Sequence, residues 1–544
     1  MHCCEPGTPG FSFFNLIAEL WRGCPNDGAV HRLCSLMRKM GAKTLIQEEI
    51  EANEEIIHEF EDIETRIGKK FIEPPQAYRL TFFAASCPDQ DWMSLPESSL
   101  LGYAIALTAD LPPDADVPDY LSASGRLSYL LEAVTRPPGR AYLAKGTEYG
   151  FRGVTNYYVH CQRNFDVYVG LMGEQRLLHV EGSLFCQQNA LTHACAHAVL
   201  KMILNTADLV GHKVTNRELN TILDIDHLER FGGDGLTLDQ VWSVINHFGL
   251  SQVGGNFLEM PTVDYAEWIY PLVESGYPVF LTFNPTHTRG HVLAVVGHTM
   301  NSDKWDCEAH LAYRPEAFGT YHASSAWVDH FIVNDDNFGM YTCMPPQYLR
   351  NRILPQYDAT QRAQVAFSVL PRGIDVPPYF AEKASVALVA RLAQSYNCAP
   401  GNKWLGRLWE QLRQPNKGIV GRTLLCTKER YFRHLAGERD SNGCGPVQEI
   451  PEELAAAPDH LWLTEISLPD LYTANKHKVG DLLTDAKAGH KTDGAPFSRF
   501  VWGWLPGIQV MKDPKAGVSP SPWPLTGHIG ILRPGRVLGP DDEW

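Results

Sequence analysis

The sequence CQQNALTHACAHAVLKMIL, residues 186–204, decides how the central part of this chain folds. Its second half consists of strong helix formers with an apolar face, which predicts a helix near 195–205. Cys195 would lie in the first turn of that helix, with Thr192 or Asn189 before it as a capping residue. Unpaired backbone N–H groups and the helix dipole favour an anion there, which lowers the pKa of a thiol. A cysteine at this position can act as a nucleophile.

The segments that follow predict helices first and strands afterwards. Thr237 and Gln240 form a capping-box signature at the start of one helix. Helices are expected at 238–248 and 264–275, and strands at 279–283, 291–296 and 330–334. This order is typical of an α+β domain, in which helices pack on an antiparallel sheet.

The chain of 544 residues is too long for one hydrophobic core, so two to four domains are expected. We place an N-terminal domain, helical and then β-rich, at 1–174 and a central domain at 175–370. A C-terminal α/β accessory domain then occupies 371–544. The flanking domains carry no motif that names a chemistry.

The flanking domains also contain segments with clear periodicity. Residues 43–70 predict a helix with an apolar stripe against an acidic face. We interpret it as a surface helix, with a coiled coil that forms a homodimer as the alternative. Further elements are strands at 78–83, 100–107 and 460–466, a helix near 380–395, and a loop at 512–524 that is rich in Pro, Gly and Ser.

Composition excludes several classes of protein. The net charge of −16 and the absence of a long Lys/Arg run argue against nucleic acid as a partner. No run approaches 18 apolar residues, so no membrane span is expected. The start of the sequence lacks the layout of a signal peptide, and the 13 cysteines are scattered without a CxxC pair. These features indicate a cytoplasmic protein with reduced thiols.

A nucleophilic thiolate needs a base, and the base needs a partner that orients it. Gly290 and His291 open one predicted strand, and a later strand ends in Asn334, Asp335 and Asp336. Cys, His and Asp therefore follow one another along the chain, each at the end of an element, from which their side chains can converge on one cleft. Just upstream of the cysteine, a side-chain amide of the Gln-Gln-Asn sequence could assist its backbone N–H as an oxyanion hole.

These motifs resemble those of papain-like cysteine peptidases, most closely the bacterial branch that includes the double-glycine leader peptidases. In that branch a Gln precedes a Cys that starts a helix, a Gly-His opens a later strand, and an Asp closes the next one. The corresponding sequences here are QQN before Cys195, GHVLAVVG at 290–297 and FIVND at 331–335. The resemblance covers the central region only and leaves both flanks unassigned.

The resemblance implies a papain-like catalytic domain in which a helix with the nucleophile packs on an antiparallel sheet. It implies Cys195 as nucleophile, His291 as base, Asp335 as orienting residue and Gln188 as oxyanion donor. The chain departs from the family where Ala and His replace the usual Gly-Pro after the cysteine. The family's Gln also lies six positions before the Cys, where this chain has Asn189. Asn189 therefore stays as the alternative oxyanion donor, as does Asp336 for the orienting residue.

Two other histidine patterns compete with this interpretation. His298 lies seven residues after His291 on one predicted strand, about 23 Å away by the rise of a strand, so the two cannot share a site. His193 and His197 have the i, i+4 spacing of a helical metal site. They lack the Glu of an HExxH motif and an evident third ligand. We expect no metal and no cofactor, with His193 at the rim of the cleft and His197 in the interior.

The motifs together predict a cysteine protease that acts on a protein or peptide substrate. Cys195 would attack a peptide or isopeptide carbonyl and form a thioester acyl-enzyme. The same triad would serve a transglutaminase or a deamidase, which is the first alternative. A non-catalytic binding module is the second alternative, although no triad position is empty in this sequence.

Overall fold

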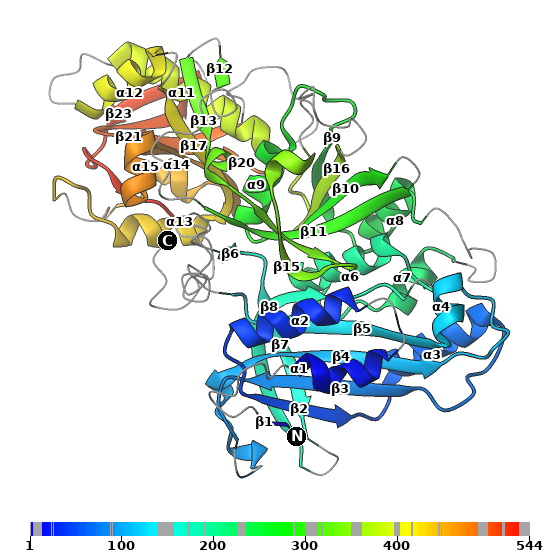
Figure 1. Ribbon diagram of the computed structural model, residues 1–544. Helices are drawn as coiled ribbons and strands as arrows, with labels where there is room; N and C mark the ends of the chain where they lie inside the picture. The colour runs from blue at the N-terminus through cyan, green and yellow to red at the C-terminus, as the bar shows by residue number, and fades with distance from the viewer. Residues whose placement is uncertain are drawn as a thin grey trace.

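The computed structural model describes most of the chain. The described residues are 2–3, 13–22, 24, 27–87, 89, 91–138, 157–170, 174–189, 191–225, 235–286, 289–300, 314–316, 319–349, 362–396, 403–414, 417–443, 447, 449–487, 499–513 and 517–532. The fold is α+β, as the order of elements predicts. Three large sheets dominate it (Figure 1).

The N-terminal sheet has seven antiparallel strands in the order β1-β2-β3-β4-β5-β8-β7. Helices α1 (Phe13–Ile17) and α2 (Gly28–Lys39) lie across one face of this sheet (Figure 1). A short helix, α4 (Asp119–Ser124), precedes β5. The strands are β1 (His2–Cys3), β2 (Thr44–Glu49), β3 (Gln76–Phe83), β4 (Leu100–Asp110), β5 (Arg126–Thr135), β7 (Arg163–Val169) and β8 (Arg176–Phe185).

The prediction of one helix over 43–70 is wrong in its first part. Thr44–Glu49 forms strand β2, which pairs with β1 and β3, and the helix α3 spans only Glu54–Ile67. Asn53 begins that helix, because its side chain accepts the N–H of Ile56 at 3.0 Å. Most of the apolar side chains of α3 are buried within this chain, whereas Ile57 is 44% exposed. The apolar stripe proposed for a dimer is therefore largely used inside the protein.

The central sheet is antiparallel and has the order β15-β14-β11-β10-β16-β9, with β6 added to β11. Its strands are β6 (Tyr157–Val159), β9 (Ser251–Asn256), β10 (Val279–Thr286), β11 (Arg289–Thr299), β14 (Phe331–Asp335), β15 (Gly339–Met344) and β16 (Ala363–Leu370). Its helices are α6 (Cys195–Ala207), α7 (Asn216–Ile222), α8 (Leu238–His247) and α9 (Tyr265–Glu274). The helices and strands predicted between 195 and 334 are all present.

Helix α6 lies where the N-terminal and central sheets meet. It contacts β8 of the first sheet and β10, β11 and β16 of the second. Buried side chains of both sheets and of α6 belong to one continuous hydrophobic core. Because α6 is enclosed on both sides, its N-terminal residue is held in a fixed position relative to the strands of the central sheet.

The predicted cap of α8 is confirmed in detail. Gln240 N–H donates to Thr237 Oγ1 at 3.3 Å, and Thr237 N–H donates to Gln240 Oε1 at 3.0 Å. These two bonds are the reciprocal pair of a capping box. A local sequence signal therefore fixed the start of this helix.

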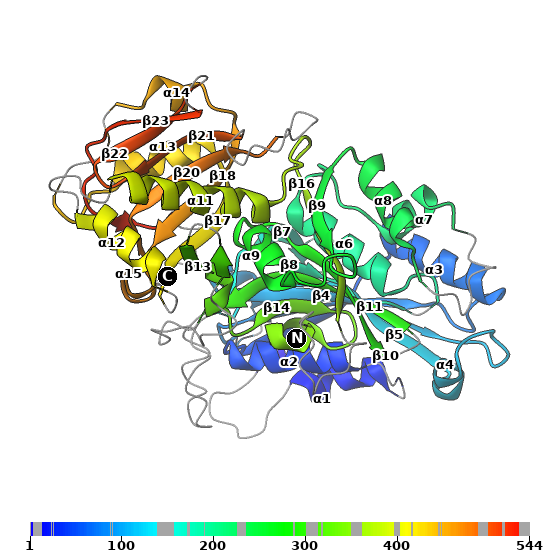
Figure 2. The same cartoon turned by 90° about the horizontal axis from the view of Figure 1, so that it is seen from above.

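The C-terminal sheet has the order β12-β13-β17-β18-β20-β21-β22-β23. Its strands β12 (Arg314–Glu316) and β13 (Gly319–Ala323) precede β14 in the sequence, and β13 pairs with β17 in parallel. Figure 2 shows this sheet beside the central one and away from α1 and α2. The other strands are β17 (Ile419–Thr427), β18 (His460–Ser467), β20 (Gly480–Asp485), β21 (Phe500–Leu505), β22 (Ile508–Asp513) and β23 (Gly517–Pro522), with β19 (His477–Lys478) and β24 (Ile529–Gly530) as a separate pair. The helices are α11 (Pro378–Tyr396), α12 (Lys403–Arg413), α13 (Lys428–Gly437), α14 (Glu452–Ala455) and α15 (Pro469–Asn475).

The prediction of a loop at 512–524 is wrong for most of its described residues. Strand β23 pairs with β22, and Pro520 and Pro522 face Val510 and Ile508 across the ladder. Proline lacks the N–H of a ladder residue and is tolerated where a strand forms the edge of a sheet, which is the place of β23. The prolines that suggested a loop are therefore compatible with an edge strand.

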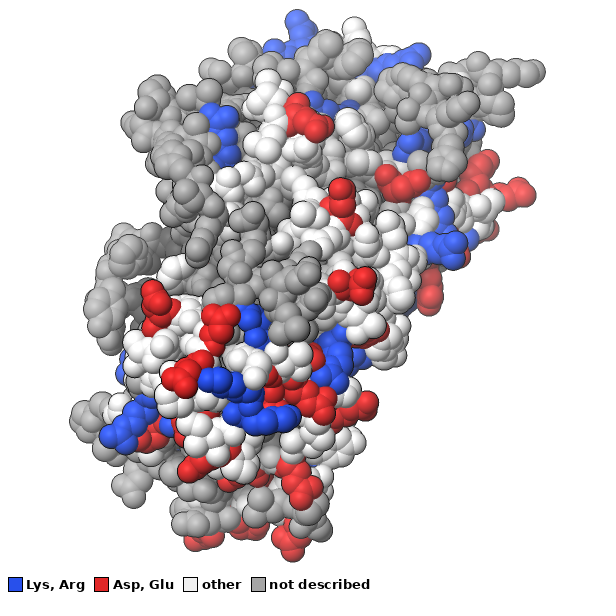
Figure 3. All heavy atoms as spheres, turned by 90° about the vertical axis from the view of Figure 1, so that its right-hand side faces the viewer, with Lys and Arg blue, Asp and Glu red and all other residues white. Residues whose placement is uncertain are grey.

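The charged surface and the helices bear on two features that the composition suggested. On the face drawn in Figure 3, Lys and Arg side chains are interspersed with Asp and Glu, and no broad basic patch is visible. Within the described part of the chain, no helix combines the length and the apolar character needed to cross a membrane.

Candidate active site

Cys195 is the first residue of α6, as the sequence predicts. The residue before it, Ala194, has an extended backbone (φ −102°, ψ 176°) and no side-chain acceptor. The expectation that Thr192 or Asn189 caps this helix is wrong. Asn189 Oδ1 instead accepts the N–H groups of Leu191 and Thr192, both at 2.9 Å, in a turn before the helix. Since no side chain caps α6 at its start, N–H groups of its first turn remain able to stabilise an anion.

The exposure of Cys195 sets it apart from most other cysteines that the structure describes. Cys195 and Cys343 are half-buried, whereas six other cysteines are buried, namely Cys24, Cys34, Cys87, Cys161, Cys186 and Cys426. Burial raises the pKa of Cys186, nine residues earlier, to about 12. Such a thiol stays protonated and unreactive at neutral pH.

His291 lies near the start of β11 and faces Cys195. Its Nε2 is 3.2 Å from Asp335 Oδ1, which leaves Nδ1 as the ring nitrogen available to the thiol. Burial alone would lower the pKa of His291, but hydrogen bonds with Asp335 and Cys195 raise it to about 10. The ring of Phe283 packs edge-on against the imidazole, with centroids 5.5 Å apart. At neutral pH this histidine is therefore an imidazolium held beside the thiol.

Two carboxyl groups lie near His291, and they differ in distance and environment. Asp335 Oδ1 also accepts the backbone N–H groups of Asn337 at 2.9 Å and Phe338 at 3.4 Å, which fixes its orientation. Asp336 Oδ1 is farther from the imidazole, at 3.8 Å from Nε2. Burial raises the pKa of Asp336 to about 7 although His291 lowers it. Asp335 is thus the better placed group to orient the histidine.

The two amides considered for an oxyanion hole have different surroundings. The Nδ2 of Asn189 donates to Thr192 Oγ1 at 2.8 Å, and the side chain is buried in its own turn. Gln188 is half-buried, and its Nε2 is 3.4 Å from Asn337 Oδ1, in the turn that follows Asp335. The amide of Gln188 is therefore close to the triad and only weakly engaged, whereas that of Asn189 is not free to turn toward a substrate.

The structure separates the other histidines from this site. His193 is buried rather than at a cleft rim, and its Nε2 is 3.5 Å from Glu59 Oε2. His197 is buried as expected, and its Nδ1 accepts the N–H of Ala194 at 3.3 Å. His298 is fully buried with Glu274, so it does not share a site with His291.

A set of buried charges behind α6 was not expected from the sequence. Lys201, in the middle of α6, is fully buried and donates to Glu55 Oε1 of α3 at 2.7 Å. One turn further along α3, Glu59 accepts from Tyr129 at 2.8 Å and from Asn216 at 2.7 Å. The Lys201–Glu55 ion pair fastens the helix of the nucleophile to α3, and the bond of Asn216 with Glu59 does the same for α7. The signal in the sequence was a lysine within an otherwise apolar helix.

Among the described residues, two groups of side chains have the spacing of a metal site. One is His291 with Asp335 and Asp336, and the other is His160 with Glu274 and His298. His193 and His197 belong to neither group.

No family model and no curated protein sequence matches this chain. The arrangement of Cys195 beside the first of these groups, His291 with Asp335 and Asp336, nevertheless defines what chemistry these side chains can perform. It places a thiol at a helix start, an imidazolium next to it and a carboxylate behind the imidazolium, which are the parts of a nucleophile, its base and an orienting residue.

Proposed function

We propose that this protein is a papain-like cysteine peptidase that hydrolyses a peptide or isopeptide bond in a protein or peptide substrate. The observation that carries the proposal is the contact of Cys195 with His291, whose Nε2 lies 3.2 Å from Asp335 Oδ1. The secondary structure supports the same assignment. The cysteine starts a helix that packs on an antiparallel sheet, and the His and Asp lie on the neighbouring strands β11 and β14.

The reaction follows from the roles of these groups. The Cys195 thiolate attacks the scissile carbonyl carbon, and the carbonyl oxygen becomes an oxyanion that the Cys195 N–H and the Gln188 amide stabilise. The His291 imidazolium gives its proton to the leaving amine as the C–N bond breaks, which leaves a thioester on Cys195. His291, now neutral, takes a proton from water, and the resulting attack on the thioester releases the acid and restores the thiolate.

The raised pKa of His291 suits this reaction. An imidazolium that persists up to about pH 10 keeps the thiolate paired and supplies the proton for the leaving group. Asp335 maintains that state, because its hydrogen bond is the main influence that offsets the burial of the ring. The proton for the leaving group is therefore on His291 before substrate arrives.

Exposed aromatic side chains beside the triad support a polypeptide substrate. Phe338 is 68% exposed, and its backbone N–H donates to Asp335. Tyr348 is 44% exposed, and its ring lies 6.4 Å from that of Phe283, which in turn contacts His291. Apolar surface at this place can hold side chains next to the bond to be cleaved.

The proposal is tested by intact mass spectrometry after incubation with electrophilic probes, one on a short peptide and one on a ubiquitin-like protein. We expect one adduct on the wild type and none on Cys195→Ala. Cys343→Ala is the matched control, since Cys343 is half-buried like Cys195, and it should react as the wild type does. Folded wild-type protein that reacts with neither probe, or a Cys195→Ala variant that still reacts, would contradict the proposal.

A further inference from the structure

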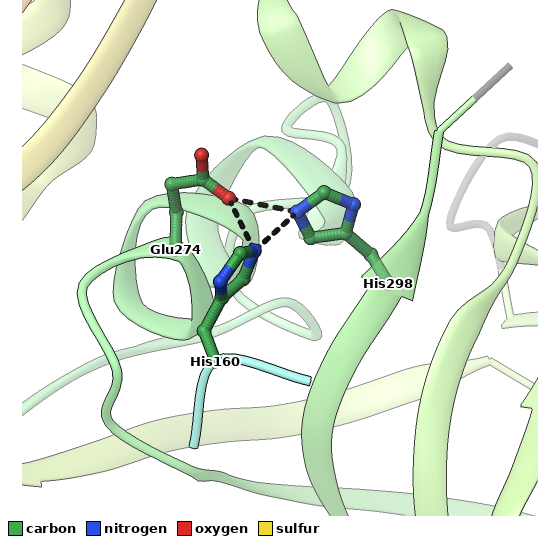
Figure 4. A group of neighbouring side chains, drawn as sticks. All are labelled: His160, Glu274 and His298. Carbon is green, nitrogen blue, oxygen red and sulfur yellow. Dashed lines mark hydrogen bonds and ion pairs between the residues drawn. The ribbon is translucent and has the colours of Figure 1, made fainter. Parts of the chain in front are cut away.

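A second group of polar side chains lies near the other end of β11 (Figure 4). His160 directly follows β6, Glu274 is the last residue of α9, and His298 is on β11. Their side chains are 0–4% exposed. His298 Nε2 lies 2.7 Å and His160 Nε2 3.1 Å from the same oxygen, Glu274 Oε2, and the two nitrogens are 3.2 Å apart. Three potential ligand atoms thus converge on one point inside the protein.

The two partners of the His298 ring favour a cation at this contact. His298 Nδ1 lies 3.3 Å from the carbonyl oxygen of Thr299, and this bond requires a hydrogen on Nδ1. In a neutral ring Nε2 then carries no hydrogen and can only accept. It nevertheless faces a carboxylate oxygen at 2.7 Å, so two acceptors are in contact. A metal ion between Nε2 and Oε2 makes this contact favourable while Nδ1 keeps its bond to Thr299, which a neutral ring cannot do.

The other oxygen of the carboxylate is already occupied. Arg422 donates to Glu274 Oε1 through Nε at 2.9 Å and Nη2 at 2.5 Å. Glu274 is therefore ionised and directs Oε2 at the two imidazoles. Hydrogens on both Nε2 atoms would satisfy the two contacts with Oε2 but would leave the two nitrogens 3.2 Å apart with no bond between them, whereas a metal ion would bind Oε2 and both Nε2 atoms at once.

The separations of the three atoms also fit a coordination sphere. Ligand atoms bound to zinc at about 2.0–2.1 Å in a tetrahedron are about 3.3–3.4 Å apart, and those around a six-coordinate ion are about 3.0 Å apart. Two of the observed distances, 3.1 and 3.2 Å, lie between these values. The third, 2.7 Å between His298 Nε2 and Glu274 Oε2, is shorter, so these two side chains would move apart by a few tenths of an ångström when an ion binds. Two imidazoles and one carboxylate form a donor set that zinc uses in proteins.

We propose that His160, Glu274 and His298 bind a divalent transition-metal ion, for which zinc fits the donor set best. The groups around them supply the supporting contacts that metal ligands usually have, namely the Thr299 carbonyl on His298 and Arg422 on Glu274. This inference does not depend on the proposed peptidase activity. It departs from the expectation of no metal, which rested on local sequence motifs.

The place of the site in the fold indicates a structural role. The ion would join the end of α9 to β11 and to the segment after β6. Through Arg422 it also reaches the C-terminal sheet, since Arg422 is on β17 and forms an ion pair with Glu465 of β18. Lys478 donates to the same Glu465 at 2.7 Å. We therefore expect the metal to fasten the C-terminal sheet to the central one.

The first test is elemental analysis of the full-length protein, purified without a histidine tag and equilibrated with zinc. We expect about one zinc per chain in the wild type and a loss of most of it in His160→Gln and His298→Gln. His291→Gln tests the other group of possible ligands and should keep the zinc. His477→Gln is a further control, because His477 and His528 form a pair of adjacent imidazoles that belongs to neither group of possible metal ligands. Folded wild type without bound zinc, or zinc lost in His291→Gln but kept in His298→Gln, would overturn the proposal.

A second measurement keeps the test decisive if the ligand variants fail to fold. Wild-type protein is stripped with a chelator and titrated with cobalt(II), whose visible absorption reports its ligands. We expect saturation at one equivalent, a rise in Tm, and the same titration in His291→Gln. Stripped protein that unfolds and refolds only with metal would support the proposal equally. No saturable absorption, or no change of Tm with metal, would overturn it.

Discussion

The two histidines of strand β11 have been given opposite environments by the same fold. His291 keeps one ring nitrogen on Asp335 and the other beside a half-buried thiol. His298 is fully buried, and both of its ring nitrogens contact protein atoms, on Thr299 and Glu274. A histidine that transfers protons needs one nitrogen near the reacting atoms, whereas a histidine with both nitrogens engaged holds structure together. Partners and exposure, rather than residue type, therefore distinguish the histidine that we propose to be catalytic from the one that we propose to be structural.

The largest expected effect is a loss of turnover when Cys195 or His291 is replaced. Cys195→Ala and His291→Ala should each lower kcat by at least about 10³-fold, because each removes a group that touches the reacting bond. The Tm of Cys195→Ala should stay close to that of the wild type, since its side chain is half-buried. His291→Ala should lower Tm at neutral pH, because it removes the charge pair with Asp335, but it should still give folded protein. The measurement pairs a peptide-cleavage assay with thermal unfolding. Loss of soluble protein in both variants would return these residues to structural roles.

A smaller loss of turnover is expected when the orienting carboxylate is changed. Asp335→Ala should also lower kcat, because the base is no longer oriented. Its effect should be roughly one to two orders of magnitude smaller than that of Cys195→Ala or His291→Ala, because the nucleophile and base remain. Asp336→Ala is the matched control and should be milder still, since its carboxyl is 3.8 Å from the ring. If Asp336→Ala is the more damaging variant, Asp336 is the orienting residue.

Replacing the Asp335 carboxylate should also change the pH dependence of catalysis in a defined direction. The pKa of His291 is about 10 in the folded state and near 6.5 in the unfolded state. Between pH 6.5 and pH 10 the folded state therefore holds a proton that the unfolded state has lost. This contribution to stability is complete below pH 6.5 and disappears as pH rises through 10. Without the Asp335 hydrogen bond the pKa of His291 falls. The alkaline limb of kcat/KM should then move to lower pH in Asp335→Asn, and an unmoved limb would exclude Asp335 as its cause.

A loss of kcat is also expected when the proposed oxyanion donor is replaced. Gln188→Ala should lower kcat by about 10²- to 10³-fold with little change in Tm, as loss of one such donor does in other acyl-transfer enzymes. Asn189→Ala should instead lower Tm, because it removes the acceptor of two backbone N–H groups. The two variants are compared in the same assay. A reversed pattern would assign the oxyanion hole to Asn189.

The smallest effect on turnover is expected for changes in the group of His160, Glu274 and His298. Glu274→Ala leaves Arg422 buried without one of its carboxylate partners, which should lower the free energy of unfolding by about 3–5 kcal/mol. The remaining folded protein should cleave substrate with an unchanged kcat, because no atom of this group reaches the triad. Denaturant unfolding and active-site titration separate the two quantities. A fall in kcat per folded molecule would show that the two ends are coupled.

Much of the central region was predictable from local sequence. The helix at Cys195, the capping box of Thr237 and Gln240, and the strands that carry His291 and Asp335 are all signalled by short-range periodicity or by residues at element ends. The chain order of Cys, His and Asp then predicted which side chains would meet.

The features that sequence did not reveal depend on contacts between distant segments. Residues 44–49 became a strand because β1 and β3 pair with them, which no helical period could indicate. His160 and His298 are separated by 138 positions, so no local spacing joins them. The choice of Gln188 over Asn189 likewise depends on a turn whose hydrogen bonds consume one of the two amides.

The most direct test of the account is the selectivity of limiting iodoacetamide at pH 6, followed by peptide mapping. An ordinary thiol, with a pKa near 8.5, is mostly protonated at that pH and reacts slowly. We predict that Cys195 is alkylated first, ahead of the equally half-buried Cys343, because a thiol at a helix start beside an imidazolium is the more reactive one. His291→Ala should slow the labelling of Cys195 alone. Label spread evenly over the thiols, or a protected Cys195, would contradict the claim that this cysteine is a nucleophile.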